Sequence, residues 1–268
     1  MTEQWRSIMP LAAIVAVLGT APLLGQGWDA SRYEVDGKKS GYLYMDETTR
    51  LLQDDDFLNP GMFAVDAGRA LWERPDPVSG VSCASCHGDA ATSMRGVAAR
   101  YPVYDPKVGG LVNLELRINQ MLVDTMDAAP LAYESDELLA LTAFIGFQSR
   151  GMPIEVAIDG PAAPFFEAGK AFYFARRGQL DLSCAQCHDD HAGDRLRGDV
   201  ISEGQVTGFP IFRLLWDEMG SRHRMFQWCN VSVRAEPYAL GSPEYLSLEL
   251  YTAWRSSGLP VETPAARR

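Results

Sequence analysis

Two stretches of the sequence share one pattern: Cys83-Ala84-Ser85-Cys86-His87 and Cys184-Ala185-Gln186-Cys187-His188. Both are Cys-x-x-Cys-His, the pattern by which haem is attached in c-type cytochromes. Two thiols three positions apart can add to the two vinyl groups of one haem, and the adjacent histidine is then held beneath the iron as its proximal ligand. A single copy has the alternative of a redox or zinc site, but two copies in a chain with four histidines make that alternative weak.

The sequence therefore predicts two covalently bound haem c groups. The expected thioether positions are Cys83, Cys86, Cys184 and Cys187, and the expected proximal iron ligands are His87 and His188. The chain has five cysteines, so Cys229 is left over. An odd cysteine in an exported protein cannot be absorbed by disulfides within one chain.

The surroundings of the two motifs repeat as well. Ala67-Gly68-Arg69-Ala70 matches Ala168-Gly169-Lys170-Ala171 at an offset of 101, which is also the difference between 83 and 184. Tyr101-Pro102-Val103-Tyr104 matches Phe209-Pro210-Ile211-Phe212 at 108, and matches from Pro130/Pro237 to Glu155/Glu262 follow at 107. Such self-similarity indicates a duplicated unit.

Each unit carries the signals of a small helical domain. We expect helices before the motifs, over 66–72 and 167–175, and closing helices that begin at the N-cap residues Ser135 and Ser242. The closing helices are expected to end at Gly151 and Gly258. Their predicted buried stripes are Leu138, Leu141 and Ile145 in one and Leu246, Leu250 and Trp254 in the other. The predicted fold is mainly α, with two tandem class I cytochrome c domains at residues 28–157 and 158–268.

The amino end indicates export. Residues 8–25 form an apolar run that is broken by a few Pro, Gly and Thr residues, and a polar stretch begins at Gln26. This is typical of a secretory signal peptide, which we place at residues 1–27; the alternative is an amino-terminal membrane anchor. We expect a periplasmic protein with no stable membrane span after cleavage.

The charge of the chain limits its partners. There are 24 Lys and Arg residues against 35 Asp and Glu residues, a net charge of −11. This is the wrong sign for neutralising nucleic-acid phosphates or anionic lipid. We expect no nucleic-acid partner, and a positively charged protein partner fits better.

The repeat also predicts the distal iron ligands. At the offset of 108, Cys229 falls opposite Met121. Methionine sulfur and cysteine thiolate can both bind haem iron. For Met121 the alternatives are a core methionine, or Met94 or Met126 as the ligand instead. For Cys229 the alternative is an inert buried thiol.

Two histidines are rival ligands for the second haem. His191 follows His188 by three residues, which is too close to reach the opposite haem face, so we expect a solvated loop residue. His223 stays open as a rival to Cys229.

Several further runs stand out. In the second half they are Leu196-Arg197-Gly198-Asp199, Gly208-Phe209-Pro210, His223-Arg224, Cys229-Asn230, Val233-Arg234-Ala235-Glu236-Pro237 and Gly241-Ser242-Pro243-Glu244-Tyr245. In the first half they are Arg117-Ile118-Asn119-Gln120 and Gln148-Ser149-Arg150-Gly151. Together they closely resemble the SoxA subunit of the SoxAX cytochrome, over nearly the whole mature chain.

The resemblance implies a periplasmic dihaem cytochrome that pairs with the smaller SoxX cytochrome. It implies that Cys229 ligates the second haem and carries a persulfide. It further implies that thiosulfate is joined oxidatively to a cysteine of the carrier protein SoxYZ, with two electrons leaving through SoxX. Thiolate is the nucleophilic form of cysteine, and persulfidation is one of its reversible modifications.

Two positions depart from the family pattern. Members with two haems usually have a cysteine where this chain has Met121, so we expect a markedly higher potential for the first haem than a thiolate would give. The family also has an arginine four residues before the active cysteine, where this chain has Met225. Arg224 is the candidate substitute as substrate contact, although a shift of one residue on a helix turns a side chain by about a hundred degrees. Its alternative role is a haem propionate partner or a surface charge.

Three functions follow as hypotheses. The first is the SoxA reaction, an L-cysteine S-thiosulfotransferase. The second is a carrier-independent dihaem thiosulfate dehydrogenase that forms tetrathionate. The third is a pure periplasmic electron-transfer cytochrome in which Cys229 is only an iron ligand.

Overall fold

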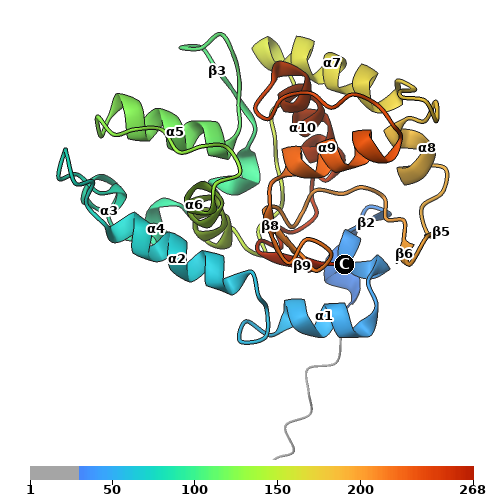
Figure 1. Ribbon diagram of the computed structural model, residues 1–268, viewed down its shortest axis with the longest axis horizontal. Coiled ribbons are helices and arrows are strands. Elements are labelled where there is room, and N and C mark those ends of the chain that lie inside the picture. The colour runs from blue at the N-terminus through green and yellow to red at the C-terminus, as the bar shows by residue number, and fades with distance from the viewer. Residues whose placement is uncertain (1–29) are drawn as a thin grey trace, which may run out of the picture.

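The structure is a computed structural model that describes residues 30–268 (Figure 1). The expected signal peptide at residues 1–27 lies outside this range. Within the described residues, no helix has the length and hydropathy that crossing a membrane requires.

The two halves of the chain contain similar elements in a similar order. The first half consists of α2 (Met62–Glu73), α3 (Cys83–His87), α4 (Ala90–Ser93), η3 (Ala98–Arg100), β3 (Val103–Asp105), β4 (Gly110–Val112), α5 (Leu114–Asp124) and α6 (Asp136–Phe147). The second half consists of η4 (Gly160–Ala162), α7 (Ala163–Phe174), α8 (Cys184–His188), β5 (Arg195–Leu196), β6 (Asp199–Val200), β7 (Ile211–Arg213), β8 (Glu218–Gly220), α9 (Arg222–Ser232), α10 (Pro243–Arg255) and β9 (Ala265–Arg267). In Figure 1 the helices of the first half lie to the left and those of the second half to the upper right.

One helix crossing organises each half: α2 packs on α6, and α7 packs on α10. Both crossings are made at a glycine of the repeated Ala-Gly-x-Ala sequence. A Cβ atom would lie 2.1 Å from the Ala140 carbonyl oxygen at Gly68, and 1.9 Å from the Ser247 carbonyl oxygen at Gly169. No side chain fits at these distances, so the glycines allow the two backbones to touch.

The closing helices begin as predicted and end earlier than predicted. Ser135 and Ser242 are confirmed as N-caps that accept hydrogen bonds from backbone amides. The helices stop at Phe147 and Arg255, however, not at Gly151 and Gly258. The reason is that the last turns tighten to i→i+3 bonds, such as Arg150 N to Phe147 O, before the glycines adopt positive φ.

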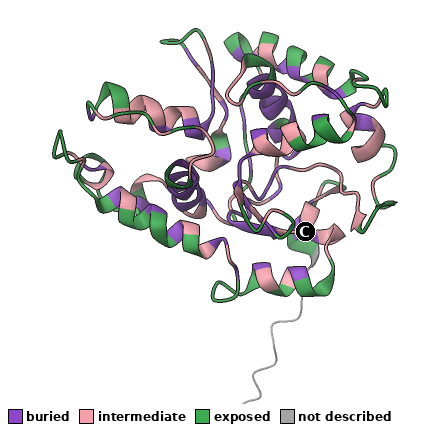
Figure 2. Ribbon diagram, in the orientation of Figure 1, coloured by how far each residue is buried: buried purple, intermediate pink, exposed green. Residues whose placement is uncertain are grey.

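Burial along the closing helices is broader than a stripe. Residues 138–146 of α6 and 245–253 of α10 are all buried, and both helices are largely purple in Figure 2. Trp254 is 39% exposed, so the prediction that it belongs to the buried stripe is wrong. Helix α7 ends at Phe174, one residue before the end of the helix predicted over 167–175, and Ala175 is its C-cap.

The halves are interlocked through their hairpins. Strand β4 of the first half packs on α10, and β8 of the second half packs on α6. The segments after the closing helices pair with each other: Gly151 N donates to Val261 O at 2.8 Å, and Val261 N donates to Met152 O at 2.8 Å. Pro153 and Pro260, which match in the sequence repeat, face each other in this pairing.

The amino-terminal segment joins the second half. It consists of η1 (Ala30–Tyr33), β1 (Glu34–Val35), β2 (Lys38–Lys39), η2 (Gly41–Tyr44) and α1 (Glu47–Asp54). Lys38 Nζ donates to Ser257 O at 2.7 Å, Tyr44 OH donates to Glu203 at 2.9 Å, and α1 packs on β9. The domain that we expected at residues 28–157 therefore contains a segment whose contacts are with the second half.

Candidate functional site

Each Cys-x-x-Cys-His motif forms a one-turn helix with a capping box. Ser82 precedes α3 and exchanges hydrogen bonds with Ser85, at 3.1 Å and 3.2 Å. Ser183 precedes α8 and exchanges bonds with Gln186, at 2.9 Å and 3.3 Å. Residues three apart on a helix share a face, so both cysteines of each motif can reach one ligand. All five cysteines are free thiols, and this donor set fits two covalently attached haems.

The two expected proximal histidines differ in the contacts that hold their imidazole rings. His188 Nδ1 lies 2.8 Å from the Ser202 carbonyl oxygen. A carbonyl can only accept, so Nδ1 carries the proton and Nε2 is left as the ligating atom. Burial lowers the pKa of His188, which favours the neutral imidazole that binds metals. His87 is exposed, and its ring centroid lies 5.6 Å from that of Trp72.

Met121 and Cys229, the expected distal ligands, occupy equivalent positions on two helices of the same length. Helices α5 and α9 each have 11 residues and begin at side-chain caps, Asn113 and Ser221. Met121 is the eighth residue of α5, and Cys229 is the eighth of α9.

Cys229 lies close to the second motif. Burial raises the pKa of Cys184 and of Cys229; Cys229 is near enough to add to the rise at Cys184, and Cys187 is near enough to add to the rise at Cys229. Solvent reaches the Cys229 side chain, but the protein around the sulfur desolvates it and raises the thiol pKa to about 11, with Arg213 acting in the opposite direction. A thiol in this place needs a metal ion to become a thiolate at neutral pH.

Each of the two rival histidines has a protein partner of its own. His223 is fully buried, with Nε2 2.9 Å from Glu249 Oε2 and with Nδ1 accepting from Gly241 N at 2.9 Å. Nδ1 is thus occupied by a backbone amide and Nε2 lies against Glu249, which favours Cys229 over His223 as the predicted ligand. His191 is an exposed loop residue, as predicted, and its Nδ1 lies 2.9 Å from Asp194.

The three methionines near the first motif have different settings. Met126 is buried in the turn after α5, Met94 is the C-cap of α4, and Met121 is partly exposed with Sδ 4.0 Å from Thr125 Oγ1. Met121 is the one at the helical position of Cys229, and it stays the predicted ligand.

Arg224, the candidate substrate contact, is engaged elsewhere. It pairs with Glu218, donates to Met219 O at 3.2 Å and lies 4.4 Å from the ring centroid of Trp216. The cation that faces Cys229 is Arg213, whose Nη1 lies 3.4 Å from Met225 Sδ. Sequence reasoning missed Arg213. The signal for it was present, because at the offset of 108 a cation there replaces Asp105 of the first half.

A polar cluster between the halves was also missed. Glu249 of α10 accepts from Asn113 Nδ2 and Arg222 Nη1, both at 2.9 Å. Burial, then the charge of Glu249, raises the pKa of the nearby Glu115 to about 8. No local pattern in the sequence joins these residues, which come from α5, α9 and α10.

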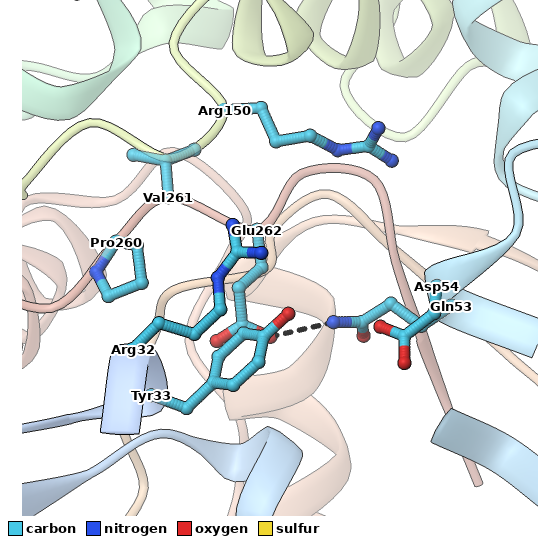
Figure 3. A pocket seen from close by; sticks show the side chains of 8 residues that line it. All are labelled: Arg32, Tyr33, Gln53, Asp54, Arg150, Pro260, Val261 and Glu262. Carbon is cyan, nitrogen blue, oxygen red and sulfur yellow. Dashed lines mark hydrogen bonds between the residues drawn. The ribbon is translucent and has the colours of Figure 1, made fainter. Parts of the chain in front are cut away.

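A small cavity lies apart from the predicted site residues. Figure 3 shows its lining, which includes Arg32, Tyr33, Arg150 and Glu262, with Gln53 hydrogen-bonded to Glu262 at 2.9 Å. None of the predicted haem or sulfur residues lines it, so it does not belong to the site around Cys229.

Comparison with known proteins supports the sequence resemblance. The family described as SoxA/TsdA, cytochrome c domain, matches residues 67–154. The chain is 40% identical to the L-cysteine S-thiosulfotransferase subunit SoxA of Pseudaminobacter salicylatoxidans, over 94% of this chain and 88% of that protein. It is 42% identical to the SoxA subunit of the same name from Rhodovulum sulfidophilum, over 87% of this chain and 81% of that protein.

A solved structure agrees with these relatives. The crystal structure of SoxXA from P. pantotrophus matches with a TM-score of 0.83 and 42% identity, covering 86% of this chain and 87% of that chain. Identity at this level over most of both chains shows that the chain belongs to the SoxA family.

Proposed function

We propose that the chain is the catalytic subunit of an L-cysteine S-thiosulfotransferase, the activity in the names of its relatives. The observation that carries the proposal is the position of Cys229 on α9, close to Cys184 and Cys187 and beside the cation of Arg213. The acceptor is a cysteine of the SoxYZ carrier. A bond forms between the carrier sulfur and the outer sulfur of thiosulfate, one proton is released, and two electrons leave.

Two covalent haems complete the proposal. Cys83, Cys86 and His87, with Met121, would hold haem 1, and Cys184, Cys187 and His188, with Cys229, would hold haem 2. When bound, each haem supplies a one-electron redox couple. Ser202 orients His188 for this role through the hydrogen bond to Nδ1.

Cys229 is the reacting group in this scheme. As a thiolate it is nucleophilic, and its persulfide is a reversible state that can hold a sulfur atom during transfer. The neighbouring guanidinium of Arg213 favours an anionic sulfur here.

The partner and the location follow the family. The structural relative is a SoxXA complex, and we propose that this chain pairs with a SoxX cytochrome that accepts the two electrons. The net charge of −11 favours a basic docking surface on a partner, and association should weaken as salt is raised. Export to the periplasm would be directed by residues 1–27.

The common architecture supports an internal duplication. Between the halves, α3 and α8 are offset by 101 residues, and α5 and α9 by 108, with equal lengths in each pair. We propose two tandem class I cytochrome c domains, at 28–157 and 158–268, whose hairpins are exchanged across the interface.

One assay separates the three possible functions. The haem-loaded complex with SoxX is supplied with thiosulfate, with and without SoxYZ. Carrier-dependent oxidation is the expected result. Oxidation without the carrier would instead indicate a tetrathionate-forming enzyme, and no oxidation would leave an electron carrier, which the methionine at position 225 favours.

A second measurement addresses the cysteine itself. Mass spectrometry of the intact chain should find an added sulfur atom on Cys229 after exposure to thiosulfate, which gives up its outer sulfur and leaves as sulfite, and Cys229→Ser should lack it. A chain that turns over thiosulfate with Cys229 always unmodified would contradict the persulfide role.

A further inference from the structure

Arg213 is held rigidly at the end of β7, beside the helix that carries Cys229. Its side chain is buried, with 8% of the residue exposed. The guanidinium lies 4.9 Å from the ring centroid of Trp216 and 4.8 Å from that of Trp228. Nε donates to Arg268 O at 3.1 Å. These contacts fix the direction of the guanidinium.

Among residues 30–268, no Asp or Glu side chain forms an ion pair with Arg213, whose Nε donates to an oxygen of Arg268, the last residue of the sequence. Each of the ion pairs in this range joins other residues, and Asp199 acts on Arg213 only through a longer-range attraction that ranks below the attraction of Cys229. Within the same range, Nη2 has no hydrogen-bond acceptor. The Nη2 edge of the guanidinium can therefore donate to an anion that arrives from outside the chain.

The guanidinium of Arg213 contacts the helix that carries Cys229. Its Nη1 is 3.4 Å from Sδ of Met225, and Met225 is one helical turn before Cys229, on the same face of α9. Arg213 therefore lies against the face of α9 that carries Cys229. An anion bound to the free edge of the guanidinium would therefore lie beside the reactive sulfur.

The first half shows the same two positions with the charges arranged differently. Asp105 ends β3 and lies 2.8 Å from Arg117 of α5. At the offset of 108 these residues match Arg213 and Met225. In the first half a carboxylate neutralises the cation. In the second half the strand supplies the cation and the helix supplies a neutral thioether, so no side-chain carboxylate within this pair neutralises the cation.

We propose that Arg213 binds the sulfonate oxygens of thiosulfate and directs its outer sulfur toward Cys229. The planar fork of N–H donors on arginine suits a tetrahedral oxyanion. This inference rests on the proposed function for its substrate. Arg224, by contrast, is already paired with Glu218.

The test uses the haem-loaded complex with SoxX and SoxYZ. Arg213→Gln should raise the KM for thiosulfate by about tenfold to a hundredfold, the size expected for lost hydrogen bonds to a charged group, while both haems stay attached through their thioethers. Adding Met225→Arg to Arg213→Gln should restore part of the affinity, because the cation returns from the adjoining position. The matched control is Arg150→Gln, which removes a guanidinium that stacks 4.8 Å from the Phe147 ring centroid and pairs with Asp56; its KM should not change.

Three results would overturn the inference: an unchanged KM in Arg213→Gln, a rise in KM in Arg224→Gln alone, or a change in haem 2 potential with normal KM. Calorimetric titration of the complex with thiosulfate separates this failure from failure of the proposed function. If turnover is absent but binding depends on Arg213, the function fails and the anion site stands. If turnover is normal and Arg213→Gln binds equally well, the function stands and the anion site fails.

Discussion

Helices α5 and α9 are built alike and differ at a few decisive residues. Each has 11 residues and a side-chain N-cap, and each presents a sulfur at its eighth position, Met121 or Cys229. One is a neutral thioether that suits an electron-transfer haem, and the other is a thiol that can become nucleophilic. The comparison shows that the same helix geometry can present either a thioether or a thiol at one position, and that the side chain then determines the chemistry.

The greatest expected effect comes from making the second half resemble the first. Cys229→Met should abolish sulfur transfer, by about a thousandfold or more, because the nucleophile is removed, while both haems stay attached through their thioethers. Turnover with SoxYZ is the readout, and the pyridine haemochrome spectrum checks haem content. Substantial turnover in this variant would show that Cys229 is not the reacting group.

The reverse change should act on the redox potential. Met121→Cys places a thiolate on haem 1, and we expect its potential to fall by a few tenths of a volt, within the span of about 0.8 V that axial ligands cover. A spectroelectrochemical titration of wild type and variant measures this. Wild-type haems with equally low potentials would contradict the assignment of Met121, and Met126→Leu is the matched control.

The two helix crossings should respond equally to an added methyl group. Gly68→Ala and Gly169→Ala each force a Cβ against a backbone oxygen, and we expect each to lower the free energy of unfolding by about 1–3 kcal/mol. Denaturant unfolding monitored by circular dichroism is the measurement. Gly110→Ala is the control, because a Cβ there meets nothing within 4 Å, and equal stability of all three variants would refute the close crossing.

The smallest expected effect concerns the cluster between the halves. Glu115 matches His223 at the offset of 108, and its pKa is raised from 4.5 to about 8. The folded state therefore binds the extra proton, so this group favours folding at low pH and its contribution is lost as pH rises from about 4.5 through 8. Glu115→Gln should raise stability near pH 8 by about 1–2 kcal/mol and flatten its pH dependence.

Unfolding measured between pH 5 and 9 would check the sign. A variant that is less stable than wild type at pH 8, or that keeps the wild-type slope, would show that the buried carboxyl is ionised in the folded protein. Glu137→Gln, on the first turn of α6, serves as the exposed control.

Part of this molecule could be predicted because its signals are local. The serine caps at Ser135 and Ser242 act within three residues, and the haem motifs place their thiols within one helical turn. The repeat then related Met121 to Cys229 without any knowledge of the fold. The ends of the closing helices were predicted too late, because the switch to i→i+3 bonds precedes the glycines.

The sequence by itself determined the two motifs, the repeated units, the odd cysteine and the absence of an arginine at position 225. Only the tertiary structure showed which cation lies against the methionine at that position. Arg224 is nearer to Cys229 along the chain, but β8 supplies Glu218 to pair with it, whereas β7 places Arg213 against Met225. The physical reason is that caps and covalent spacing depend on neighbouring residues, while a charge beside a reactive sulfur depends on how a strand packs on a helix.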